Sequence, residues 1–164
     1  MRTVNLEAYT TADARTVLAT LADPARYPAV AAGVESVRVL DGDPPTSEWR
    51  LRFRRGSLWW RQRDEVSVGK RCIRFAQTTG QLANLTGAWR LGTVPGGTVV
   101  HYHVELAVGV PIYDRIVEPL LALTFRRIAR DVLTATLPDA VVRHDGADAE
   151  SHLDAIEYSF PPTE

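Results

Sequence analysis

Apolar and polar residues alternate along most of the chain, and this pattern predicts a protein built mainly from β-strands. The first alternation sets Val4, Leu6 and Ala8 against polar neighbours and indicates a short strand. From residue 34 to residue 108, about six further alternating segments follow, separated by turn sequences such as Pro95–Gly97. Consecutive strands joined by short turns favour an antiparallel meander.

Two short helices are predicted directly after the first strand. Apolar residues at helical spacing over residues 17–21 give the first helix its buried face, and Thr10 or Thr11 is its expected cap. The sequence Asp23-Pro24 restarts the chain as a second helix, with Asp23 as cap and Pro24 at the first helical position.

The C-terminal part carries one long helical pattern, in which apolar residues recur three and four positions apart from Pro111 to Val141. Because proline removes a backbone hydrogen bond, we expect a short segment before Pro119 and the main helix from there to about Leu137. A curved antiparallel sheet of about six or seven strands wrapped around this helix is an α+β helix-grip architecture with an internal cavity. We therefore expect one domain over residues 1–142 and a polar, loose tail over residues 143–164.

Composition agrees with one globular domain and excludes several functions. The chain has 164 residues and a net charge of −1, so no basic field draws it to nucleic acid or to an anionic membrane surface. No apolar run approaches the roughly 20 residues that span a bilayer, and the first residues lack the apolar core of a secretory signal. The single cysteine, Cys72, cannot form an internal disulfide. We therefore expect a cytoplasmic protein.

Three local sequences stand out on the predicted elements. They are LADPARYP at residues 21–28, LTGAWRL at residues 85–91 and GGTVV at residues 96–100. Together with the long terminal helix they resemble the START-like (SRPBCC) superfamily, in its polyketide cyclase/dehydrase and lipid-transport family, over residues 4–137. Within that superfamily the pattern is most similar to two branches, the aromatase/cyclases of aromatic polyketide biosynthesis and the coenzyme-Q-binding proteins.

The resemblance implies a deep hydrophobic pocket between the sheet and the long helix, a small hydrophobic or aromatic ligand, and no required metal or cofactor. Aromatase/cyclases typically carry a pocket arginine on the strand that here spans residues 58–68. Glu65 stands at that position, with Arg61 and Arg63 nearby, unless a bulge shifts the register. For a polyketide substrate, presentation on an acyl carrier protein is expected.

Alternation within residues 58–68 places Gln62 and Asp64 on the same face as Trp60. If this face is concave, Asp64 lies in an apolar pocket, where burial raises its pKa and suits it to proton transfer near neutral pH. Tyr102 lies on the same kind of face and could donate a hydrogen bond to a developing enolate. Asp64, Tyr102 and Gln62 are therefore the predicted catalytic residues.

Two features also have a structural interpretation. Asp64 could instead pair with an arginine at the rim of the sheet, such as Arg126 or Arg127. His101 and His103 resemble a metal pair, but no third ligand has recognisable spacing, so they fit a ladder of cross-strand charge pairs on the outer face better. We expect no metal site.

Aromatic residues of the strands and of the second short helix are predicted to line the pocket and to stack on planar ligands. The expected substrate-binding residues, including two from the long helix, are Tyr27, Trp49, Phe53, Trp60, Phe75, Trp89, Leu120 and Thr124. Trp59 and Trp60 point to opposite faces of their strand. One of the two indoles is therefore either exposed, where it could mark a contact with a second copy of the chain or with a carrier protein, or covered by another element, such as the tail with Tyr158 and Phe160.

Two functions from different classes follow from these patterns. The first is a cofactor-independent polyketide cyclase, aromatase or dehydratase, a lyase of antibiotic biosynthesis that folds a polyketide intermediate so that its reacting carbons meet. The second is a non-enzymatic binding or carrier protein for a lipid, an isoprenoid quinone or an aromatic metabolite, which needs only the pocket. A regulatory or interaction domain with a vestigial cavity is a third alternative.

Overall fold

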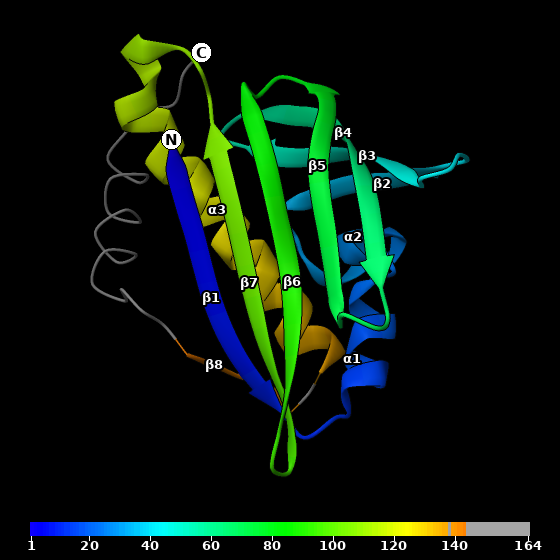
Figure 1. Ribbon diagram of the computed structural model, residues 1–164. Helices are drawn as coiled ribbons and strands as arrows, with labels where there is room; N and C mark the ends of the chain where they lie inside the picture. The colour runs from blue at the N-terminus through cyan, green and yellow to red at the C-terminus, as the bar shows by residue number, and fades with distance from the viewer. Residues whose placement is uncertain (138, 144–164) are drawn as a thin grey trace.

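A computed structural model describes residues 1–137 and 139–143. The strands form one antiparallel sheet in the order β2-β3-β4-β5-β6-β7-β1-β8. Their bounds are β1 Arg2–Thr10, β2 Val34–Leu40, β3 Thr46–Phe53, β4 Gly56–Ser67, β5 Cys72–Gly80, β6 Asn84–Val94, β7 Gly97–Ala107 and β8 Val141–Arg143. The sheet is curved, and the long helix α3, Pro111–Thr136, crosses its concave face (Figure 1). The predicted α+β helix-grip fold is confirmed.

The sheet has eight strands among the described residues, where the sequence pattern indicated six or seven. The additional strand is β8, which pairs with β1 and places Val142 opposite Ala8. Three residues are too few to show alternation, and the helical spacing upstream extends to Val141, which explains the difference. Residue 143, the expected start of the tail, is the last residue of β8, and residues 144–164 lie outside the described part of the chain.

Two short helical segments follow β1, as expected, although the first cap differs. Helix α1 spans Ala14–Leu21 and is capped by Asp13, whose side chain accepts the Thr16 backbone N–H at 2.8 Å. The expected caps Thr10 and Thr11 instead donate to Asp139, beyond α3. A 3₁₀ turn, Pro24–Arg26, then leads into helix α2, Tyr27–Val30. Asp23 precedes this turn, but its side chain makes no capping hydrogen bond.

Helix α3 continues through Pro119, where we expected a break. Glu118 and Pro119 are both buried, and Glu118 Oε1 accepts the backbone N–H of Val108 at 2.9 Å. Leu120, Leu121 and Leu123 are also buried. This burial fixes the turn against the sheet, so one missing backbone hydrogen bond does not end the helix. No helix in residues 1–137 and 139–143 is long and apolar enough to cross a membrane.

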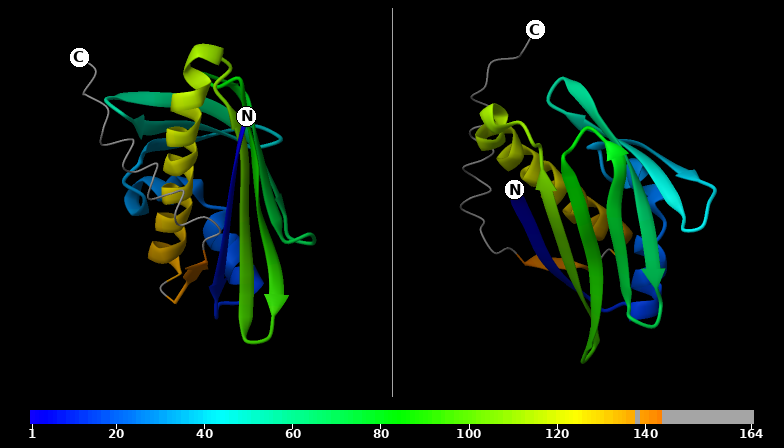
Figure 2. Two further views of the ribbon diagram at one scale, coloured as in Figure 1. Left: turned by 90° about the vertical axis from the view of Figure 1, so that its left-hand side faces the viewer. Right: turned by 45° about the horizontal axis from the view of Figure 1, so that its top comes forward.

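The main core lies between α3 and strands β1 and β7, which α3 contacts directly. Its fully buried aliphatic side chains include Val4 and Leu6 of β1, Val100, Val104 and Leu106 of β7, and Leu121, Val132 and Leu133 of α3. Helices α1 and α2 lie beside α3 on the same face of the sheet, and α2 contacts both α3 and β2 (Figure 2). The three helices thus cover one face, and the sheet curves so that β2 and β3 run crosswise to β6, β7 and β1 (Figure 1).

Candidate functional site

A cavity of about 310 Å³ lies between the concave face of the sheet and the helices. Strands β2 to β7 contribute to its wall together with residues of α1, α2 and α3. Four exposed residues, Asp23, Val39, Pro45 and Val66, border it and mark its mouth. The fold therefore keeps a hollow interior at this end of the sheet.

All three predicted catalytic residues line this cavity: Asp64, Gln62 and Tyr102. It is also lined by five of the predicted ligand-binding residues, namely Tyr27, Trp49, Trp60, Phe75 and Trp89. The remaining three, Phe53, Leu120 and Thr124, are absent from its wall.

The geometry explains why these three residues lie elsewhere. Phe53 is the last residue of β3, opposite Gly56 at the hairpin end, and it packs against the core beyond the cavity. Leu120 lies about 140° around the helix from Phe125, since each residue of an α-helix turns about 100°. Thr124 lies one turn before Ile128 but is absent from the wall, and its hydroxyl donates to the Leu120 carbonyl at 3.1 Å. The face of α3 toward the cavity carries Phe125, Ile128 and Ala129 instead.

The pairing of β3 with β4 brings together the central residues of the site. Trp49 lies directly opposite Trp60, and Ser47 lies opposite Gln62. The two indoles stack at 5.7 Å between ring centroids with an interplanar angle of 9°. Asp64 follows Gln62 two positions along β4, so it points to the same concave face.

Asp64 accepts two side-chain hydrogen bonds within this arrangement. Ser47 Oγ donates to Asp64 Oδ2 and Gln62 Nε2 donates to Asp64 Oδ1, both at 2.7 Å. The indoles extend the chain of bonds, because Trp49 Nε1 donates to Ser47 Oγ and Trp60 Nε1 donates to Gln62 Oε1, both at 2.8 Å. We call these five residues, Ser47, Trp49, Trp60, Gln62 and Asp64, the Asp64 network.

The network fixes which oxygen of Asp64 can carry a proton. An indole N–H can only donate, so Trp60 orients Gln62 with its amide oxygen toward the indole and its amide nitrogen toward Asp64. Asp64 Oδ1 therefore faces a group that cannot accept a hydrogen bond. Ser47 on the other side can both donate and accept, so the protonated acid fits with its hydrogen on Oδ2.

The surroundings of Asp64 also shift its proton affinity. Burial raises the pKa of Asp64 above its ordinary value of 3.8, and the hydrogen bonds from Ser47 and Gln62 oppose this change without cancelling it. These two donors take the place of the arginine partner that the structural interpretation expected. The side chain is only partly buried and borders the cavity, so its carboxylate can meet a ligand.

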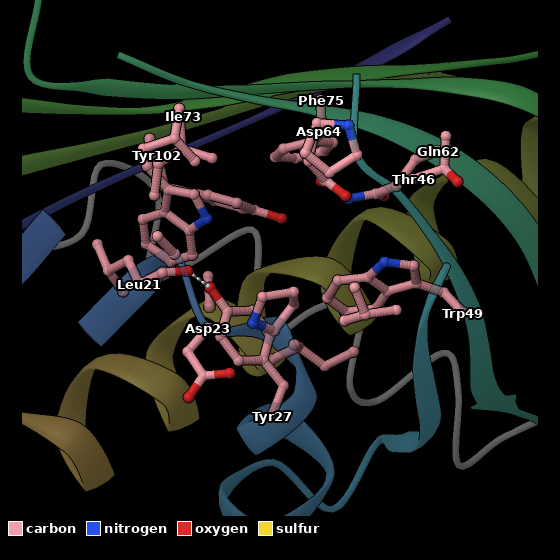
Figure 3. Close-up of a pocket in the computed structure, with 18 of the residues that line it drawn as sticks. Leu21, Asp23, Tyr27, Thr46, Trp49, Gln62, Asp64, Ile73, Phe75 and Tyr102 are labelled. Carbon is pink, nitrogen blue, oxygen red and sulfur yellow. Dashed lines mark hydrogen bonds between the residues drawn. The ribbon is translucent and has the colours of Figure 1, made fainter. Parts of the chain in front are cut away.

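Two tyrosines and Thr46 supply the remaining hydroxyl groups on the described wall of the cavity. Tyr27 donates to the Leu21 carbonyl at 2.7 Å, which occupies its hydroxyl hydrogen. The ring of Tyr102 packs against Trp89 at 4.4 Å, across the cavity from Asp64 (Figure 3). Among the described residues no group accepts a hydrogen bond from Tyr102, so its hydroxyl is available to a ligand. Burial raises the pKa of both tyrosines, which keeps them neutral donors.

Gly87, in the sequence LTGAWRL, makes room for one wall of the cavity. It lies opposite Phe75 in the pairing of β5 with β6. A Cβ atom at this position would collide with the Phe75 ring and would come within 2.7 Å of the His103 carbonyl oxygen. Glycine is therefore required here for the Phe75 ring to lie against the sheet and border the cavity.

The charged residues of β4 point away from the cavity. Arg61, Arg63 and Glu65 are exposed, and Arg61 Nε lies 2.9 Å from Glu48 Oε2 on the neighbouring strand. A bulge does interrupt the pairing of β4 with β5, between Arg61 and Gln62, but it leaves the arginines on the outer face. Residue 65, the expected position of a pocket arginine, thus lies outside the cavity as well.

The two histidines of β7 also lie on the outer face. His103 Nδ1 is 2.7 Å from Asn5 Oδ1, and its Nε2 is 3.5 Å from Glu105 Oε1. Within residues 1–137 and 139–143, no three His, Cys, Asp or Glu side chains come close enough to hold a metal ion. Trp59, on the outward face of β4, is half-buried, and its backbone N–H donates to Gln81 Oε1 at 2.8 Å.

Sequence reasoning missed three polar residues of the site, Ser47, Asp23 and Thr46, and Thr46 lines the cavity. Ser47 is almost fully buried and binds Asp64, and the available signal was its position two residues before the inward-facing Trp49. Asp23 was assigned to a helix cap, whereas its carboxylate stands at the cavity mouth. The cap pattern before Pro24 is common enough to hide this second role.

Comparison with known proteins agrees with this geometry. The sequence model for polyketide cyclase / dehydrase and lipid transport proteins matches residues 10–133. No curated protein sequence matches the chain. Among solved structures, a protein from Thermus thermophilus aligns with a TM-score of 0.74 at 20% identity, covering 84% of this chain and 98% of that chain.

Two further solved structures show the same fold. A START superfamily protein from Mycobacterium smegmatis has a TM-score of 0.70 at 15% identity and covers 83% of this chain and 97% of its own. The Zhui aromatase/cyclase from Streptomyces sp. R1128 has a TM-score of 0.57 at 19% identity and covers 96% of this chain and 92% of its own. Since the family model spans most of the described residues, the chain belongs to the polyketide cyclase/dehydrase and lipid-transport family.

Proposed function

We propose that this protein binds a polyketide-type or aromatic intermediate in its cavity and promotes aldol-type cyclisation or dehydration, with Asp64 as acid and base. The observation that carries the proposal is the Asp64 network. It holds one carboxyl group of raised pKa at a fixed place on an aromatic wall. A group of this kind is suited to take and return a proton near neutral pH.

The proposed chemistry needs one proton to move twice. Asp64 Oδ2 takes a proton from a carbon beside a ketone, and the resulting enolate carbon attacks a second carbonyl of the same folded chain. The new alkoxide takes the proton back from Asp64, which gives the aldol product, and loss of water completes a dehydration. Tyr102 donates a hydrogen bond to the oxygen on which the enolate charge develops.

Much of the expected acceleration is orientational. The stacked indoles of Trp49 and Trp60 and the ring of Phe75 form flat walls, against which a flexible chain can fold with its reacting carbons close together. Gln62 and Ser47 act as positioning residues for Asp64, because their hydrogen-bonding groups already point at it. A substrate delivered on an acyl carrier protein would project its thioester end through the mouth at Asp23 and Val66.

A non-enzymatic binding protein is the second candidate, and one observation favours it. Both oxygens of Asp64 already accept hydrogen bonds, so the carboxylate could serve only to hold the two indoles in place. The cavity would then carry a lipid, an isoprenoid quinone or an aromatic metabolite, for which an apolar pocket is sufficient. The two candidate functions predict different effects on turnover when the charge of Asp64 is removed.

The deciding experiment is turnover by Asp64→Asn with a synthetic poly-β-ketone chain. Asparagine fits the network, since its oxygen can accept from Gln62 and its nitrogen can donate to Ser47, so the cavity should keep its shape. We expect the rate of cyclisation to fall at least about 100-fold while the affinity for this neutral ketone chain, which has no ammonium or carboxylate group, changes little. The control is Glu65→Gln, the outward-facing neighbour on β4. Turnover by Asp64→Asn equal to that of the parent would refute the catalytic proposal and leave the carrier.

A further inference from the structure

The charged groups that line the cavity all have one sign. Asp23 stands at the mouth and Asp64 inside, and none of the described residues on the wall is an arginine, a lysine or a histidine. The chain has 19 basic residues, so their exclusion is a property of this face and not of the composition. On β4 the alternation sends Arg61 and Arg63 outward and Gln62 and Asp64 inward.

An anionic ligand would lose its water in this cavity without gaining a cation. Ser47 Oγ and one N–H of Gln62 Nε2 already donate to Asp64. The hydroxyl of Tyr27 donates to the Leu21 carbonyl, which leaves as neutral donors on the described wall the hydroxyls of Tyr102 and Thr46 and the second N–H of Gln62. A buried anion needs a cation or several hydrogen bonds, and these neutral donors lie in a cavity whose charged groups, Asp23 and Asp64, both repel it.

A ligand that donates a hydrogen bond meets the opposite situation. Each oxygen of Asp64 accepts one hydrogen bond from the network, and a carboxylate oxygen has room for another. A hydroxyl or an ammonium group can therefore bind Asp64 directly, and such charge-assisted bonds are short and strong. An ammonium also gains from the aromatic faces nearby, where Tyr27 meets Trp49 edge-on at 5.5 Å and Trp49 stacks on Trp60.

We infer that the cavity selects ligands that have no carboxylate or other anionic group and that donate a hydroxyl or ammonium hydrogen to Asp64. This selectivity rests on the proposed function, since it concerns the same cavity. It would apply to a carrier as well as to an enzyme. For a polyketide substrate it means that the acid end enters masked, as an ester, a thioester or a lactone.

The test compares four probes that share one naphthalene ring system and one substitution position: naphthol, naphthylmethylamine, naphthoate and its methyl ester. Affinities for the full-length protein are measured by isothermal titration calorimetry at neutral pH. We expect naphthol, the amine and the ester each to bind at least tenfold more tightly than naphthoate. In Asp64→Asn, naphthylmethylamine should lose most of its affinity advantage over naphthoate. Naphthoate should bind this variant more tightly than it binds the parent.

Glu65→Gln is the matched control, because it removes a negative charge from the outer face of the same strand, and its four affinities should equal those of the parent. The inference is overturned if naphthoate binds the parent as tightly as its methyl ester does, if Asp64→Asn preserves the ranking, or if none of the four probes binds. Turnover is not needed for any of these outcomes. A protein that shows the ranking but cyclises no substrate would keep the inference and lose only the enzymatic function.

Discussion

The concave face of the sheet has a packed half and a hollow half. In the packed half, aliphatic side chains of β1 and β7 interdigitate with Leu121 and Leu133 of α3. In the hollow half, β3–β5 present two stacked indoles and a hydrogen-bonded carboxylate, and a cavity remains. Alternation decides which residues face inward in both halves. Whether the space between the sheet and the helices is filled depends on the shape of these side chains. The indoles are held by hydrogen bonds, so they cannot turn inward to close the space as leucine side chains can.

The largest expected contrast is between two leucines that are equally buried. Leu133 in the packed half is 0% exposed and Leu51 on the cavity wall is 1% exposed. Leu133→Ala should cost near the upper end of about 2–5 kcal/mol, and Leu51→Ala near the lower end, because Leu51 already borders empty space and loses fewer contacts. Urea unfolding with unchanged m-values measures both. Equal costs would mean that the hollow half is packed as tightly as the other.

A smaller loss is expected from Ser47→Ala in the hollow half. This change leaves Trp49 Nε1 and Asp64 Oδ2 without their partner, and unpaired buried polar groups cost about 1–3 kcal/mol. The control is Ser36→Ala, an exposed position on β2, which should stay within about 0.5 kcal/mol of the parent. Chemical denaturation of the two variants side by side decides the matter. If Ser47→Ala is as harmless as its control, the network does not stabilise this wall.

These contrasts also show what the sequence could and could not predict. The inward direction of Gln62 and Asp64 followed from the two-residue period of β4, which persists over a long strand. The bond from Ser47 depends on which residue of β4 lies opposite, and that register is set by a turn that alternation does not specify. The sequence therefore predicted the residues of the wall better than the bonds between them.

Helix α3 shows a second limit of the sequence pattern. Buried residues occupy much of its circumference, including Leu120, Leu121, Leu123 and Phe125 in succession with only short interruptions. A helix covered on several sides has no single apolar stripe, so the pattern cannot tell which buried residue faces the cavity. Leu120 and Thr124 were expected there, and Phe125, Ile128 and Ala129 are found.

The effect of acid on stability should have opposite signs in the two halves. Burial raises the pKa of Asp64, so its ionised form costs stability at neutral pH. The parent should therefore gain stability over Asp64→Asn as the pH falls through the raised pKa, a gain that is complete below the ordinary value of 3.8. At neutral pH the variant should melt at the same temperature as the parent or slightly higher. A Tm difference that does not change with pH would contradict a raised pKa.

Asp139 provides the opposite case, at the end of the packed half. Its carboxylate accepts from the Thr11 hydroxyl, from Thr10 Oγ1 at 2.8 Å and from the Thr11 backbone N–H at 2.9 Å, and these bonds lower its pKa to about 2. The stability that Asp139 contributes is present above its ordinary pKa of 3.8 and is lost as the pH falls toward about 2. Asp139→Asn should therefore lower the Tm at neutral pH, and its difference from the parent should vanish in strong acid.

The smallest expected effect is the coupling between these two carboxylates. Asp64 and Asp139 share no hydrogen-bond partner, since one binds Ser47 and Gln62 and the other binds Thr10 and Thr11. The Tm changes of Asp64→Asn and Asp139→Asn should therefore add in the double variant at every pH. Asp139→Asn should also leave probe affinity unchanged, because it lies outside the cavity wall. A double variant that departs from additivity would show that the hollow half and the packed half respond as one unit, and that the cavity is held open by contacts beyond its own wall.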